Sequence, residues 1–175
     1  MARKVSEFVS ELADREAIKD CLLRYPRIMD RLDLSLAETF YWPEATDSHA
    51  GMFSGKLSQY FLFIEPMLRQ MEQTQHCLSN MLIEIDGSEA RVETYVVGYH
   101  CIGKEENKLF ITAAGRYLDV LHKRDDEWRL FKRQLVLDWI KNDPDHSTWG
   151  EKLPEQIDGC RKPYDPSCGL FKRLG

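Results

Sequence analysis

The amino-acid sequence predicts an α+β fold in which helices come first and an antiparallel sheet follows. Apolar residues recur at helical spacing up to about residue 71. From residue 76 onward they alternate with polar residues along four long segments, which is the pattern of half-buried strands. The connections between these segments are short, and short connections join antiparallel neighbours. We therefore expect three N-terminal helices to cover one face of a curved antiparallel sheet.

The first 32 residues carry two helical stripes of apolar residues. These stripes fall within 5–12 and 17–32, and Asp14 can cap the second stretch. Pro26 lies inside that stretch. Because proline lacks an amide hydrogen, we expect a kink there.

Further helices are expected before the sheet. Asp33 can cap a short helix over 34–40, and Gly55 precedes a longer amphipathic helix over 56–71. The segment 45–52 between them is ambiguous and is compatible with a short strand. The four long strands are predicted at 76–85, 90–102, 109–122 and 128–140.

The chain divides into a folded domain over residues 1–140 and a C-terminal tail over 141–175. Periodicity disappears in the tail, and four prolines interrupt it. Yet the tail carries more large apolar residues than a purely disordered segment would: Trp149, Leu153, Ile157, Tyr164, Leu170 and Phe171. We therefore expect the tail to pack on the domain or on a neighbouring subunit.

Composition argues against several classes of function. The formal net charge is −5 and the basic residues are scattered, so we expect no nucleic-acid or anionic-membrane partner. No stretch resembles a targeting signal or a membrane span. The five cysteines form no C-x-x-C pair, which indicates reduced thiols and a cytoplasmic location. The ten glycines form no phosphate-binding motif, so no nucleotide or flavin cofactor is expected.

Asp30 and His76 are the strongest candidates for chemistry. Asp30 lies near the end of the second helical stretch, and His76 opens the first predicted strand. A carboxylate that binds one nitrogen of an imidazole fixes its tautomer and leaves the other nitrogen to take a proton. We therefore predict a hydrogen bond of about 2.6–3.2 Å between the two side chains. Taken separately, each has a plainer interpretation, His76 as an exposed strand-end residue and Asp30 as a surface charge.

Other polar residues share a predicted face with leucines, which is typical of an apolar pocket with a few convergent polar groups. Alternation puts His76, Leu78 and Asn80 on one face of the first long strand, and Val96, Gly98 and His100 on one face of the second. On the last long strand it groups Phe131, Arg133, Leu135 and Leu137. The alternatives stay open that His100 is an edge residue and Arg133 part of an exposed basic pair. Asp47 and His49 are the only closely spaced pair of metal-ligand type, too few to predict a metal site.

Several motifs resemble the SnoaL-like branch of the nuclear-transport-factor-2-like (NTF2-like) superfamily, over about residues 10–140. The matching segments are 11–20, Tyr25, 29–31, 115–117, 128–129 and 138–139. Members of that superfamily fold as a cone-shaped curved antiparallel sheet behind helices. The resemblance implies the same cone here.

Within that superfamily, the segments at Asp30 and His76 are similar to those of scytalone dehydratase and hexachlorocyclohexane dehydrochlorinase, which use an Asp–His dyad to eliminate a leaving group. The resemblance implies a cofactor-independent, dehydratase-like lyase with His76 as base and Asp30 as its partner. It also implies substrate contacts from His100, Arg133, Tyr25 and His49. Met29 stands where the dehydratase has a tyrosine, so another small, partly apolar substrate is expected in place of scytalone.

Two other functions fit the same superfamily. The protein is alternatively a non-catalytic small-molecule binding module or a subunit of a larger oxygenase, because this fold hosts all three. A dyad whose free imidazole nitrogen faces an open cavity would favour the enzyme.

We also expect a homo-oligomer, with a trimer first and a dimer second, since the related lyases are trimers. The sheet face away from the helices is predicted to carry Tyr95, Val97, Tyr99, Met81, Ile83 and Ile85. A monomer of this size usually leaves less apolar surface in water.

Overall fold

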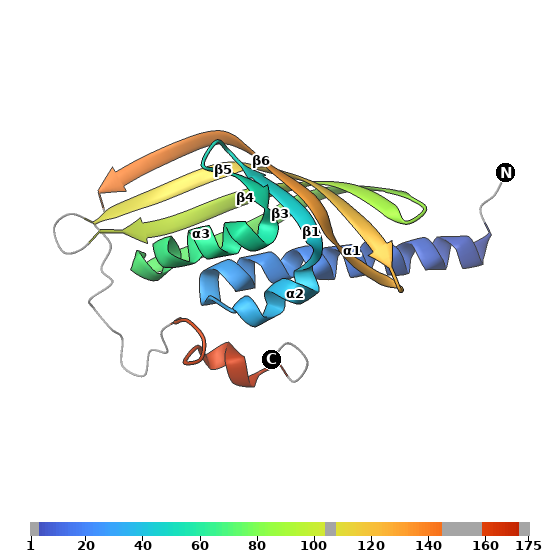
Figure 1. Ribbon diagram of the computed structural model, residues 1–175, viewed down its shortest axis with the longest axis horizontal. Helices are drawn as coiled ribbons and strands as arrows, with labels where there is room; N and C mark the ends of the chain where they lie inside the picture. Colours follow the sequence, from blue (N-terminus) through green and yellow to red (C-terminus); the bar gives the residue numbers. More distant parts are fainter. Residues whose placement is uncertain (1–3, 104–107, 145–158, 172–175) are drawn as a thin grey trace.

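The computed structural model of the protein describes residues 4–103, 108–144 and 159–171. Figure 1 shows a curved sheet with its helices gathered on one side, which confirms the predicted α+β class. The helices, in chain order, are α1 (Val5–Arg31), a 3-10 turn (Leu34–Leu36), α2 (Ala37–Phe40), α3 (Leu57–Gln70) and a C-terminal 3-10 turn (Pro166–Gly169). The strands are β1 (Tyr41–His49), β2 (Phe53–Lys56), β3 (Gln73–Asp86), β4 (Glu89–Ile102), β5 (Leu109–Arg124) and β6 (Glu127–Pro144).

The sheet has the strand order β2-β1-β6-β5-β4-β3. The four long strands form the predicted antiparallel meander. The segment that was ambiguous in the sequence supplies the end of β1, which runs parallel to β6 and antiparallel to β2. This pairing puts Asp47 opposite Arg133 and His49 opposite Leu135, so the Asp47–His49 pair belongs to the sheet and not to a loop.

The two N-terminal stripes belong to one continuous helix, so the expected break at Asp14 is wrong. The Asp14 carboxylate caps no helix there; it accepts hydrogen bonds from Trp128 (2.8 Å) and Lys123 (2.9 Å). The first turns of α1 extend past the sheet (Figure 1), and Val5 is 78% exposed. The second stripe alone packs into the core of the described chain.

The predicted short helix after Asp33 is present, but Asp33 does not cap it. The segment forms a 3-10 turn followed by one turn of α2, and no side-chain hydrogen bond caps either of them. The Asp33 carboxylate instead binds Arg27 at 3.0 Å and Ser35 at 2.7 Å. Its charge is therefore used in tertiary contacts.

A bulge in β3 reverses part of the predicted facing. The register with β4 shifts between Leu78 and Met81, and one extra residue moves all following side chains to the other face. As a result Asn80 is exposed, whereas Ile83 is buried beneath the helices. The prediction that Met81, Ile83 and Ile85 lie on the outer face is wrong, because all three pack in or against the core.

A second bulge affects β6. The register with β5 shifts between Val120 and Leu121, which leaves Phe131 as the extra residue. Its ring stacks on His122 with centroids 4.0 Å apart instead of joining the inner face. Arg133 remains on the inner face and is 1% exposed.

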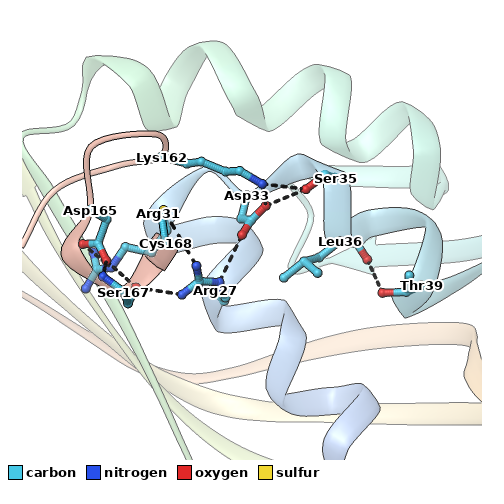
Figure 2. Close-up of polar contacts among 10 residues, drawn as sticks. All are labelled: Arg27, Arg31, Asp33, Ser35, Leu36, Thr39, Lys162, Asp165, Ser167 and Cys168. Atoms are coloured by element: carbon cyan, nitrogen blue, oxygen red, sulfur yellow. Dashed lines mark hydrogen bonds and ion pairs between the residues drawn. The ribbon is translucent and has the colours of Figure 1, made fainter. Parts of the chain in front are cut away.

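Residues 159–171 of the tail lie against the end of α1 (Figure 2). Lys162 donates to the Asp33 carboxylate at 2.8 Å, and its backbone amide donates to the Arg31 carbonyl at 2.8 Å. Ser167 accepts from Arg27 at 2.9 Å. The middle of the tail, 145–158, lies outside the described residues, as do Trp149, Leu153 and Ile157.

Replacing Asp33 tests how much this polar cluster stabilises the fold. Burial acts to raise the pKa of the Asp33 carboxyl, but its hydrogen bonds with Lys162, Ser35 and Arg27 hold the pKa below its usual value. Asp33→Asn should lower the free energy of unfolding at pH 7 by about 1–3 kcal/mol. A lowered folded pKa gives stability that is present above the unfolded pKa and is lost as pH falls through the folded one. Urea unfolding should therefore show the variant and the wild type converging in acid.

The matched control is Asp126→Asn, because the Asp126 side chain is 99% exposed. That change should alter stability by less than about 0.5 kcal/mol. An Asp33→Asn protein as stable as the control at pH 7 would contradict the assignment.

Candidate functional site

The structure brings Asp30 and His76 together. Asp30 projects from the last turn of α1, and His76 lies near the start of β3. One carboxylate oxygen lies 2.7 Å from His76 Nδ1, and the other accepts the His76 backbone amide at 2.7 Å. Both side chains are about nine-tenths buried. The distance agrees with the predicted hydrogen bond.

This geometry defines the state of the imidazole. Although burial acts to raise the pKa of Asp30, the hydrogen bonds and charge of His76 hold the pKa below its usual value, so the carboxyl is ionised at neutral pH. An ionised carboxylate can only accept, so Nδ1 carries the proton. In the neutral form of the ring, the lone pair therefore lies on Nε2, which makes no hydrogen bond with another described residue.

His100 and Gly98 of β4 complete this end of the site. The His100 ring meets the His76 ring edge-on, with centroids 5.3 Å apart. A Cβ atom at Gly98 would lie 2.9 Å from His100 Cε1 and 3.6 Å from His76 Nε2. Glycine therefore leaves the space that both rings occupy. Burial is the main cause that lowers the pKa of His100 to about 4, and the charge of the neighbouring His76 adds to it.

The lowered pKa of His100 has a measurable consequence. The unfolded chain binds a proton near pH 6.5 and the folded protein near pH 4, so acid favours unfolding between these values. His100 should contribute a stability loss of up to about 1.4 kcal/mol per pH unit in this window. His100→Gln should flatten that part of the curve, as measured by urea unfolding at several pH values. An NMR titration of the His100 ring with a midpoint near 6.5 would refute this.

An apolar cavity of about 410 Å³ opens beside these residues. Its polar lining consists of His49, Tyr60, His76, His100 and Tyr117. Its apolar lining comes from α1, α3, the sheet and the loop after β1, and includes Met29, Met67, Ile111, Leu137 and Ile140. No Lys, Arg, Asp or Glu among the described residues lines the cavity. The space therefore suits an uncharged, largely apolar molecule.

Asp47, His49 and Tyr60 form a second polar group in the wall of the same cavity. His49 Nδ1 lies 3.2 Å from an Asp47 oxygen, and His49 Nε2 lies 3.2 Å from the Tyr60 hydroxyl. The Tyr60 hydroxyl in turn lies 3.4 Å from that of Tyr25. All four residues are buried.

Arg133 and Tyr25 lie beneath the cavity and not in its lining. Arg133 donates two hydrogen bonds to Asp119, at 2.8 and 2.7 Å, and both side chains are fully buried. Burial acts to lower the pKa of Arg133, but the Asp119 charge holds it above its usual value, so the guanidinium stays charged. That guanidinium lies 4.3 Å from the ring centre of Tyr25 and 3.9 Å from that of Tyr117. The position of Arg133 therefore indicates that it holds the rings of Tyr25 and Tyr117 in place and does not contact a ligand directly.

The sequence therefore identified three cavity histidines and Asp30, the partner of His76, but missed Asp47 and Tyr60 as the partners of His49. His49, His76 and His100 were all singled out and all line the cavity. Asp47 was considered only with His49, as a pair of metal-ligand type too small to predict a metal site, and Tyr60 was not among the candidates. The weak signal for Asp47 was the spacing Asp47-x-His49, which puts two side chains on one strand face. Across the described ranges, no group of three or more His, Cys, Asp or Glu side chains is arranged to hold a metal ion.

Comparison with known proteins gives the family. The model of the SnoaL-like domain matches residues 10–134, so the chain belongs to the SnoaL-like domain family. The resemblance read from the sequence is confirmed. No protein with a curated description matches the chain. No helix of the described residues has the length and apolar character needed to cross a membrane.

Solved structures share the fold at low sequence identity. The Kfla4162 protein of Kribbella flavida is 20% identical, with a TM-score of 0.68, covering 75% of this chain and 95% of its own. A protein of Novosphingobium aromaticivorans provisionally named a scytalone dehydratase is 24% identical, with a TM-score of 0.67 and coverages of 77% and 90%. A type 2 hexachlorocyclohexane dehydrochlorinase, LinA, is 21% identical, with a TM-score of 0.69 and coverages of 77% and 91%. These likenesses show that the chain shares its fold with these proteins.

Proposed function

We propose that the protein is a cofactor-independent lyase of the dehydratase type, in which His76 removes a proton from a small substrate. The observation that carries the proposal is the position of the His76 ring between a carboxylate and a cavity. Asp30 holds Nδ1 at 2.7 Å, and the ring lines the apolar space. An oriented imidazole with an available Nε2 is what abstraction of a proton from carbon requires.

In the proposed reaction, His76 Nε2 takes a proton from a carbon that a neighbouring carbonyl or ring makes acidic. The electron pair of the broken C–H bond forms a double bond as the leaving group departs from the next carbon. Asp30 keeps the ring in one tautomer and stabilises the imidazolium that forms. His100 stays neutral at physiological pH, and an imidazole N–H can donate to negative charge that develops on the substrate.

The cavity suggests the class of substrate. No Lys, Arg, Asp or Glu among the described residues lines it, so a carboxylate or phosphate would find no fixed counter-charge. Uncharged cyclic ketones and phenols fit this chemistry. The names of two structural neighbours, a dehydratase and a dehydrochlorinase, denote elimination reactions and support the same reaction type.

The rival proposals remain a non-catalytic binding module and a subunit of a larger oxygenase. In both, the cavity would hold a ligand without any proton transfer. The buried Asp30–His76 pair would then be a satisfied polar contact. Exchange of carbon-bound hydrogen separates these proposals from the lyase.

Deuterium exchange tests the base directly. The purified protein should accelerate exchange from D₂O into uncharged cyclic ketones and phenols, beginning with cyclohexanone and followed by NMR. His76→Ala removes the base and Asp30→Asn its orienting partner, so each should slow exchange about 10²–10⁴-fold. Thermal unfolding should show both variants folded.

His122→Ala is the matched control, because His122 stacks on Phe131 and does not line the cavity. It should exchange at the wild-type rate. Exchange that survives in His76→Ala would disprove the role of His76 and make His100 the next base to test.

We also retain the proposal of a cytoplasmic homo-oligomer, with a trimer as the first choice. The proposal is supported by aromatic side chains on the outer face of β4. Tyr95 is 44% exposed there, and Tyr99 stacks on Phe110 with ring centroids 5.9 Å apart. Light scattering at micromolar concentration should give about three times the monomer mass of 20.5 kDa. A stable monomer would contradict it.

A further inference from the structure

A second Asp–His pair reaches the cavity through His49 and has no role in the proposed reaction. Asp47 and His49 lie two residues apart on β1, and His49 stacks on Tyr60 of α3 with ring centroids 4.7 Å apart. The three groups form a chain of hydrogen bonds that starts at a buried carboxylate and ends at a hydroxyl in the cavity wall.

We propose that Asp47, His49 and Tyr60 form a proton relay that delivers a proton to the leaving group while His76 removes one from carbon. This inference rests on the proposed function and adds an acid to its base. It assigns Tyr60 as the catalytic residue that touches the leaving oxygen, with His49 as the proton source and Asp47 as a positioning residue.

The tautomers of His49 permit the transfer. When His49 is neutral, its Nδ1 proton bonds Asp47 and its Nε2 accepts the Tyr60 hydroxyl proton. When His49 is an imidazolium, Nε2 also carries a proton and donates it to the Tyr60 oxygen. The Tyr60 proton is then free to point at a bound molecule. Burial raises the pKa of Tyr60, which disfavours a lasting phenolate and suits a hydroxyl that gains one proton as it loses another.

The relay lies near the base. Tyr25 connects the two pairs: its hydroxyl is 3.4 Å from that of Tyr60, and its ring meets the His76 ring edge-on with centroids 6.3 Å apart. His49 and His76 both line the one cavity. A small ring held in this space can therefore contact a base and an acid together.

The step balances for loss of water from a β-hydroxy ketone. His76 Nε2 takes the proton from the α-carbon, the C–H electrons form the C=C bond, and the C–O bond breaks. The departing oxygen takes the Tyr60 proton and leaves as water, while the Tyr60 oxygen takes the Nε2 proton of His49. His76 ends as the imidazolium and His49 as the neutral ring, so the charge of the protein is unchanged. Exchange with water resets the two rings.

The environment of Asp47 matches a carboxylate that must stabilise a positive ring. Asp47 is 2% exposed, and its second oxygen makes no hydrogen bond to a described group. The position opposite Asp47 on β6 is Arg133, whose charge Asp119 already binds. Among the described residues, His49 is therefore the hydrogen-bond partner of the Asp47 carboxylate.

The test compares a poor leaving group with a good one on the same ring. The probes are 3-hydroxycyclohexanone, whose hydroxide must be protonated to leave, and 3-chlorocyclohexanone, whose chloride leaves unaided. Both give cyclohexenone, which is followed by its ultraviolet absorbance. Tyr60→Phe and His49→Gln should each slow loss of water about 10²–10⁴-fold. For the same variants, the loss in chloride elimination and in deuterium exchange into cyclohexanone should be at least about tenfold smaller than the loss in dehydration.

Tyr41→Phe is the matched control, since Tyr41 stacks on Phe61 outside the cavity. It should behave as the wild type with all three compounds. If Tyr60→Phe slows the loss of hydroxide and of chloride equally, Tyr60 has only a structural role. If Tyr60→Phe dehydrates at the wild-type rate, Tyr60 has no role in the reaction. Either result overturns the relay without affecting the assignment of His76 as the base. Should the wild type act on none of the three compounds, the proposed function fails and the relay with it.

Discussion

The hydrogen bonds between Asp30 and His76 connect the fold to the chemistry. One carboxylate accepts both the ring Nδ1 proton and the backbone amide of His76. The backbone bond attaches the end of α1 to the start of β3, and the ring bond orients the imidazole. The same contact therefore positions a helix on the sheet and selects the tautomer of a base. Burying a charge is costly, and these two hydrogen bonds offset part of the cost of burying the Asp30 carboxylate.

The surroundings of this pair reinforce it from two sides. Beneath the cavity, the buried Arg133–Asp119 pair lies against the rings of Tyr25 and Tyr117, which fixes an aromatic wall next to His76. Behind the helix, residues 159–171 bind the end of α1 through Arg31 and reach the Met71 carbonyl at the end of α3 through Arg161. The C-terminal ends of both helices that border the site thereby contact one segment.

Two features of the sheet decided where the sequence prediction succeeded. Alternation along β4 was unbroken, so Val96, Gly98 and His100 face the cavity as predicted. Alternation along β3 and β6 was interrupted by bulges, which moved Asn80 and Phe131 out of the predicted face and Ile83 into the core. A bulge is selected by the fit of a whole strand to its neighbour, and nothing local in these segments marks the extra residue.

The sequence by itself determined the α+β class, the four long strands, the family and the three histidines of the cavity. These follow from periodicities and motifs that are encoded locally. Tertiary structure alone decided that α1 is one helix, that β1 pairs in parallel with β6, and that Asp47 and Tyr60 meet at His49. Taken alone, the sequence around Asp47 is compatible with a loop, and the sequence around Tyr60 with an ordinary core helix. Their partners became defined only when β1 packed against β6 and α3, which brought these polar side chains together in the interior.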